Sequence, residues 1–156
     1  MAERETQTEI GKDPRREGMM GDTIRRVDYF YTETPDKPEE GAKTLSALRD
    51  AGVNLLAFTG FPSGRRSQID FIPEDTAAFK SAAKKAGIRL SPKKTGFLVQ
   101  GEDRIGAIAD IMSKLAAARI NVTAIDAICA GEGRYGAILW VKPRDVRKAA
   151  RALGAS

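Results

Sequence analysis

Residues 36–55 read DKPEEGAKTLSALRDAGVNL, and residues 103–122 read DRIGAIADIMSKLAAARINV. The two stretches align without a gap at one constant offset. Matched positions carry the same residue in several places: Asp36 and Asp103, Ala42 and Ala109, Ser46 and Ser113, Leu48 and Leu115, Ala51 and Ala118, Asn54 and Asn121. Such self-similarity at a fixed spacing indicates an internal duplication, so both copies are expected to build the same unit.

Hydrophobic periodicity predicts the same order of elements in each copy. In the first copy, the order β-α-β-β-α-β falls on residues 24–32, 39–51, 53–59, 68–71, 73–86 and 88–90. Gly52 and Gly87 stand where the two helices end, and Pro73 opens the second helix. In the second copy, the same order occupies residues 95–100, 105–119, 121–128, 135–141 and 143–153, and no sequence is left for a last strand.

This order is the ferredoxin-like pattern of an α+β unit, whose antiparallel sheet carries both helices on one face. We therefore predict two ferredoxin-like units, residues 23–92 and 93–156, of which the second lacks its last strand. We expect the two sheets to join or abut, with all four helices on one side. Residues 1–22 carry many charges without periodicity and are predicted to form a flexible tail.

The composition excludes most catalytic chemistry. The 156 residues include no histidine and one cysteine, Cys129, which rules out His-based catalysis, cysteine clusters and an intrachain disulfide. No activated nucleophile, carboxylate pair or metal cluster can be assembled, so we expect no enzyme activity, no cofactor and no metal. No apolar run is long enough to cross a bilayer and the N-terminus has no apolar signal core, which predicts a cytoplasmic protein without a membrane span.

Two loops in each copy carry a family resemblance. The second copy reads DRIG at residues 103–106, where its first helix begins, and INV at residues 120–122, where its next strand begins; the first copy reads DKPE at 36–39 and GVNL at 52–55. These loops resemble the ACT domain family of small amino-acid-sensing regulatory modules, whose pattern is Asp/Asn-basic-Pro-Gly, a helix, then Gly-Ile/Val-Asn-Ile. The resemblance covers residues 24–156 as two tandem copies. Glu39 replaces the family's glycine, and Ile105 stands where the family prefers proline.

The resemblance implies a non-catalytic regulatory protein that senses a free amino acid at an interface between ACT units and acts on a metabolic enzyme. Within one unit, the two loops lie at opposite ends of the sheet, so only two units packed side by side and head to tail bring them together. In a tandem chain, one predicted site joins Asp103, Arg104, Ile105 and Gly106 to Asn54 and Leu55. The other joins the loop from Asp36 to Glu39 to Asn121 and Val122.

The residue types at these positions suit an amino-acid ligand. The unpaired amides of a helix N-terminus favour a carboxylate, and Asp103 can accept hydrogen bonds from an ammonium group. Gly106 lets the backbone approach a ligand, whereas the charge of Glu39 predicts weaker binding at the first-copy loop. The alternative role for Asp103 is a helix cap, and the alternative for Asn54 and Asn121 is closure of a turn.

Two other functions stay open at this stage. A structural or partner-binding module would need no ligand at these loops. An RNA-binding ferredoxin-like domain shares the strand order and suits the net charge of +5. Residues 134–141, RYGAILWV, lack the alternating aromatic residues of the RNA-binding signature, so we expect nucleic acid not to be the partner.

The predicted sheet edges indicate self-association. Without a fourth strand in the second unit, the strand at 95–100 is expected to be an unpaired edge, which tends to recruit another strand. The strand at 135–141 is apolar at nearly every position, which is typical of burial on both faces. Both features predict a homodimer.

Overall fold

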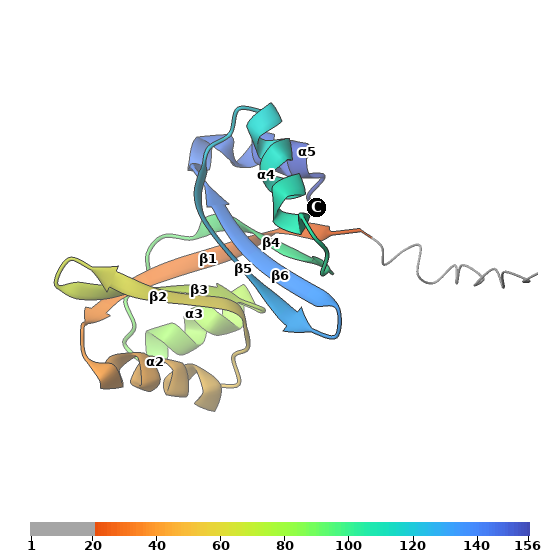
Figure 1. Cartoon of the computed structure of the whole chain (residues 1–156). Coiled ribbons are helices and arrows are strands. Elements are labelled where there is room, and N and C mark those ends of the chain that lie inside the picture. The colour runs from red at the N-terminus through yellow and green to blue at the C-terminus, as the bar shows by residue number, and fades with distance from the viewer. Residues whose placement is uncertain (1–20) are drawn as a thin grey trace, which may run out of the picture.

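The computed structural model describes residues 21–156 and contains six strands and four α-helices in that part of the chain (Figure 1). The elements are β1 (Thr23–Pro35), α2 (Pro38–Asp50), β2 (Leu55–Ser63), β3 (Arg66–Pro73), α3 (Thr76–Lys85), β4 (Lys94–Glu102), α4 (Ala107–Ala117), β5 (Val122–Gly131), β6 (Arg134–Val141), a short 3-10 turn (Pro143–Asp145) and α5 (Val146–Leu153). Most of the predicted tail lies outside the described residues.

The duplication is visible in these bounds. When Asp36 is placed on Asp103, α2 falls on residues 105–117, where α4 lies, and β2 falls on residues 122–130, where β5 lies. Local signals place the helix ends: Asp75 caps α3 by accepting a hydrogen bond from the Ala78 amide at 3.0 Å, and Pro38 opens α2. We call residues 23–92 the first repeat and residues 93–156 the second repeat.

All six strands form one antiparallel sheet in the order β2-β3-β1-β4-β6-β5. The duplication makes this order symmetric, because β2, β3 and β1 correspond to β5, β6 and β4. The long strand β1 joins the halves: residues 30–35 pair with β3, and residues 23–29 pair with β4. Residue Ser156 makes two backbone hydrogen bonds to the part of β1 that pairs with β4. The Arg26 amide donates to the Ser156 carbonyl, and the Ser156 amide donates to the Ile24 carbonyl.

Two sequence predictions about strands are wrong. Residues 88–90 form no strand, because the Ile88 amide donates to the Ala83 carbonyl and closes the end of α3. The next residue, Ser91, does hydrogen-bond to β1: its amide donates to the Tyr31 carbonyl, and its hydroxyl accepts from the Tyr31 amide. The strand at 95–100 is not an unpaired edge either, because β1 and β6 pair with it on its two sides. Each repeat therefore uses the other's first strand where a fourth strand was expected.

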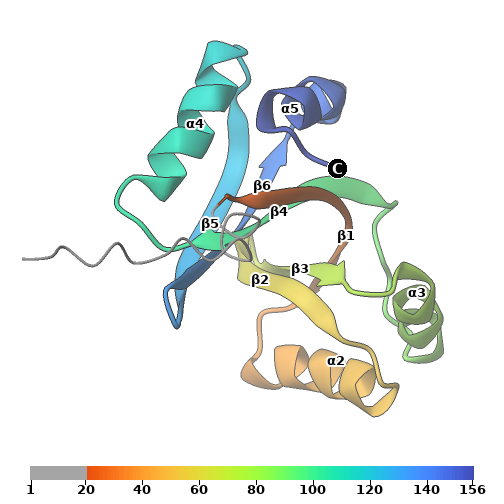
Figure 2. The ribbon, with the colours of Figure 1, turned by 90° about the vertical axis from the view of Figure 1, so that its right-hand side faces the viewer.

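The sheet bends so that its two halves lie face to face, and this corrects the expectation of four helices on one side. Figures 1 and 2 show α4 and α5 on one outer side and α2 and α3 on the opposite one. One face of each half packs against its own helices, around Phe97 and Leu139 in the second repeat and Phe71 and Phe79 in the first. The faces without helices meet in a third core of Val27, Ile72, Leu98, Ile138 and Trp140.

The third core explains the apolar sequence of β6. Its residues Tyr135 and Ala137 to Val141 are all buried, as predicted from the pattern. Leu139 faces α4 and α5, whereas Ile138 and Trp140 face the first repeat. Burial on both faces thus arises within one chain, so neither β6 nor the paired strand β4 requires a second copy.

Candidate functional site

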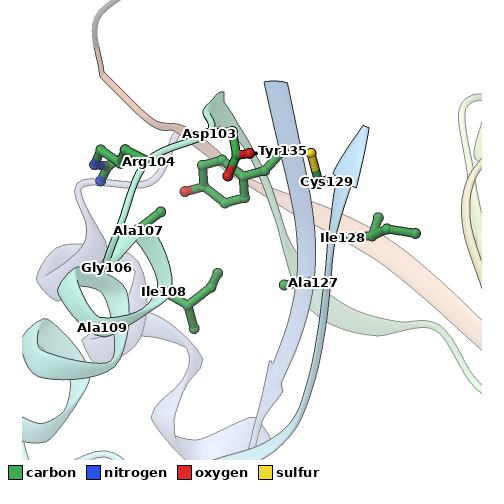
Figure 3. Close-up of a pocket in the computed structure, with 10 residues that line it drawn as sticks. All are labelled: Asp103, Arg104, Gly106, Ala107, Ile108, Ala109, Ala127, Ile128, Cys129 and Tyr135. Atoms are coloured by element: carbon green, nitrogen blue, oxygen red, sulfur yellow. Dashed lines mark hydrogen bonds between the residues drawn. The ribbon is translucent and has the colours of Figure 1, made fainter. Parts of the chain in front are cut away.

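A pocket of about 270 Å³ lies where α4 begins, between that helix and strands β5 and β6 (Figure 3). The predicted residues Asp103, Arg104 and Gly106 line it. The predicted residue Ile105 does not line it and is fully exposed to solvent. The remaining wall comes from Ala107, Ile108, Ala109, Ala127, Ile128, Cys129 and Tyr135.

Asp103 does not cap the helix, so the alternative role for this residue is not the one observed. Its carboxylate accepts a hydrogen bond from Cys129 Sγ at 3.3 Å, and its backbone amide donates to the Gly133 carbonyl at 2.8 Å. The N-cap of α4 is Gly106, at a φ of 81°, and no side chain caps it. Because a thiol is a weak donor, the Asp103 carboxylate keeps acceptor capacity beside the pocket.

The first turn of α4 supplies donors to the same pocket. The Ala107 amide donates to the Arg104 carbonyl at 3.3 Å, whereas the amides of Ile108 and Ala109 have no acceptor within residues 21–156. Both residues line the pocket. A helix N-terminus carries partial positive charge, so these amides favour an anionic group. The residues that line this small pocket therefore include one carboxylate and two residues whose amides have no acceptor within residues 21–156.

Arg104 lines the pocket and also forms two ion pairs beside it. Its guanidinium pairs with Asp22 and with Asp110, both at 3.1 Å, and in Figure 3 it extends away from Cys129. Partial burial acts to raise the pKa of Asp22, but its hydrogen bonds from Arg104 and the nearby Tyr135 hydroxyl outweigh the burial and lower that pKa. Asp22 was predicted to belong to the flexible tail, and nothing in its local sequence indicates this contact.

Tyr135 is a buried site residue that the sequence did not single out. Burial, followed by the nearby Asp22 carboxylate, raises the pKa of its hydroxyl to about 12. The hydroxyl makes no hydrogen bond of good geometry within residues 21–156. A Cβ on Gly101 would overlap both the Asp22 carboxylate and the Tyr135 ring, so glycine is needed there for the two side chains to lie side by side.

Asp22→Asn is expected to lower the thermal midpoint at neutral pH by roughly 2–4 °C, because the bridge to Arg104 is weakened. The folded pKa of Asp22 is lowered, so its contribution is complete above the unfolded value of about 4 and is lost as the pH falls through the folded value. Thermal unfolding from pH 7 to pH 2 is the measurement. The difference in thermal midpoint between the wild type and Asp22→Asn should disappear below about pH 4. An equal difference in thermal midpoint at all pH values would contradict the assignment, and Asp50→Asn, which removes an exposed carboxylate paired with Arg49, is the matched control.

The other predicted residues lie outside this pocket. Asn54 is exposed just before β2, where its side chain donates to Glu74 at 3.3 Å, so it links the start of β2 to the segment after β3. Leu55 packs against the first-repeat core. Asp36 accepts from Ser67 Oγ at 2.9 Å. Asn121 is exposed before β5, and Val122 packs against the second-repeat core. Within one chain, Asn54 and Leu55 therefore do not line the Asp103 pocket.

Solved structures with similar folds support the resemblance. A protein from Bacteroides thetaiotaomicron matches with a TM-score of 0.69 and 14% identity, over 85% of this chain and 88% of that one. The regulatory subunits of aspartate kinase from Thermus thermophilus and Thermus flavus match with TM-scores of 0.57 and 0.52 and identities of 18% and 21%, over 87% of this chain and 96% of each subunit. The chain has an ACT-like fold.

Sequence comparison adds nothing to this likeness. No family model matches the chain, and no curated protein matches it. Within the described residues, no cluster of three or more potential metal ligands occurs. No helix in that part of the chain has the length and hydrophobicity to cross a membrane.

Proposed function

We propose that this protein is a non-catalytic regulatory module that senses a free amino acid in the pocket at residues 103–109. The carrying observation is that one pocket combines the Asp103 carboxylate with the free amides of Ile108 and Ala109. An α-ammonium group would donate to Asp103, and an α-carboxylate would accept from the amides. Its volume of about 270 Å³ lies just below the usual range of small-molecule sites, in keeping with a ligand as small as an amino acid. The fold shared with aspartate kinase regulatory subunits supports a regulatory role on a metabolic enzyme.

A second copy of the chain is proposed to complete this site. Strands β2 and β5 are the two edges of the sheet, and the outer side of β5 is largely exposed. If β2 of one copy pairs along β5 of another, Asn54 and Leu55 come beside the Asp103 loop. The symmetric contact brings Asp36 toward Asn121 and Val122. In this arrangement, residues 23–92 and 93–156 are two ACT-like units that meet their counterparts in a homodimer.

Asp103→Asn is expected to weaken amino-acid binding by about 10- to 100-fold, since a hydrogen bond to a charged group contributes about 1.5–3 kcal/mol. The change keeps the size of the side chain and removes only its charge. Calorimetric titration is the measurement, and Asp36→Asn, at the matching position of the first repeat, is the control. Binding that falls equally in both variants, or in neither, would show that the Asp103 pocket is not the site.

Ile128→Lys is expected to shift the protein from dimer to monomer in light scattering at tens of micromolar. Ile128 lies on β5 with 74% of its surface exposed, which is unfavourable for a side chain with no partner. Met112→Lys is the matched control, because Met112 is also an exposed apolar residue but lies on α4 and not on a strand edge. A wild-type protein that is monomeric in this range would reject the dimer.

A further inference from the structure

A second cleft differs in charge from the Asp103 pocket. It has a volume of about 540 Å³ and lies between the outer part of β1, the start of β4, the end of β6 and α5. Five cationic side chains line it, and none of the lining residues is acidic. The cations are Arg26, Lys93, Lys94, Lys142 and Arg147. We call this feature the basic cleft.

The cations of the basic cleft come from four separate segments of the chain, which is why the sequence shows them as scattered. None of them forms an ion pair with any acid within residues 21–156. Lys94 is held over the Tyr31 ring, with Nζ 4.9 Å from the ring centroid. Like charges gathered around one hollow repel each other, so a bound anion would be favoured there.

The floor of the basic cleft adds neutral hydrogen-bonding groups. Thr95 and Thr123 line it together with Trp140. Trp140 is 5% exposed, and its indole Nε1–H has no acceptor within residues 21–156. Its ring meets Tyr29 edge to face, with the centroids 5.8 Å apart. An oxygen-rich ligand can accept hydrogen bonds from the Thr95 and Thr123 hydroxyls, whereas the Trp140 Nε1–H is buried.

A neighbouring hollow of about 670 Å³ extends the basic surface along α5. It shares Arg26 and Arg147 with the basic cleft and adds Arg151. The two adjoining hollows are therefore lined by six cationic side chains in all. Together they can hold a ligand with more than one anionic group. Nucleic acid is the less favoured occupant, because single-strand recognition depends on aromatic rings open to stacking and Trp140 is buried.

We propose that the basic cleft binds a phosphorylated small molecule of nucleotide size that carries at least two negative charges. A cleft of about 540 Å³ lies within the range of small-molecule sites. Phosphate oxygens accept from arginine and lysine, and the Thr95 and Thr123 hydroxyls contact the remainder of the ligand. This site is separate from the Asp103 pocket and does not depend on amino-acid sensing.

The test titrates the full chain with ATP, ADP and pyrophosphate by calorimetry. The double variant Lys142→Glu/Arg147→Glu reverses two exposed cations of the basic cleft. The control Arg65→Glu/Lys84→Glu changes the net charge equally at exposed positions outside it. We expect the cleft variant to bind ATP or pyrophosphate at least about tenfold more weakly and the control to bind as the wild type does. Amino-acid binding should be the same in all three proteins.

Three outcomes would overturn the proposal. The first is no binding of any of these probes to the wild type at about 1 mM. The second is equal weakening in the cleft and control variants, which would indicate attraction by net charge alone. The third is a single-stranded RNA that binds more tightly than ATP and is lost with the same cations, which would make the cleft a nucleic-acid site.

Discussion

Ile72→Ala is expected to lower the free energy of unfolding by about 2–5 kcal/mol. Ile72 lies on the sheet face that carries no helix, and on a flat ferredoxin-like sheet it would be solvated. Here its side chain is completely buried, because the bend at β1 brings it against Leu98, Ile138 and Trp140 of the second repeat. Removing its outer methyl groups leaves a cavity between the two half-sheets, in addition to the lost burial.

Urea unfolding followed by circular dichroism measures this difference. Ile128→Ala, measured on protein dilute enough to be monomeric, is the matched control, because Ile128 lies on the same kind of face but is largely exposed within one chain. The control should change the unfolding free energy by no more than about 0.5 kcal/mol. Equal, small effects of the two substitutions would show that the half-sheets do not pack against each other.

Gly106→Glu is expected to abolish amino-acid binding. Gly106 begins α4 at a φ of 81°, which side chains other than glycine rarely adopt, and a Cβ there meets no atom within 4 Å. Because Gly106 lines the pocket and has free space around it, a glutamate there brings a negative charge that opposes the carboxylate of the ligand. The substitution also reproduces the residue that the first repeat has at the matching position, Glu39.

Two variants separate charge from strain in this experiment. Gly106→Ala carries the backbone strain without the charge and should retain binding. Gly87→Glu places a glutamate at another glycine of positive φ, 72°, which follows α3 and does not line the pocket, and should also retain binding. Calorimetry on purified, folded variants is the measurement. Gly106→Glu that binds as the wild type does would remove the α4 N-terminus from the site.

The fold was predictable where the signal is local or repeated. The helices follow from apolar residues spaced for one face and from caps such as Asp75, and the strands follow from alternation. The constant offset that places Asp36 on Asp103 defines the two repeats from the sequence alone. At the site, the ACT-like motif located Asp103 and Gly106, which do line one pocket.

The structural features that were not predicted from the sequence depend on contacts between distant segments of the chain. The pairing of β1 with β4 and the bend that closes the third core involve strands from different repeats, and no local pattern specifies them. The same holds for Arg104, whose partner Asp22 is 82 residues away. The basic cleft was not predicted because Arg26, Lys94 and Arg147 come together only after folding.

A thermal-shift screen of the wild-type chain against the twenty amino acids tests amino-acid sensing most directly. A ligand at 100 times its dissociation constant stabilises the protein by about 2.7 kcal/mol, which corresponds to roughly 5–10 °C for a chain of this size. The proposal predicts such a shift for one amino acid or a few related ones, and none in Gly106→Glu. If none of the twenty shifts the wild type, the protein is not an amino-acid sensor, and a structural or partner-binding role is the remaining interpretation of its fold.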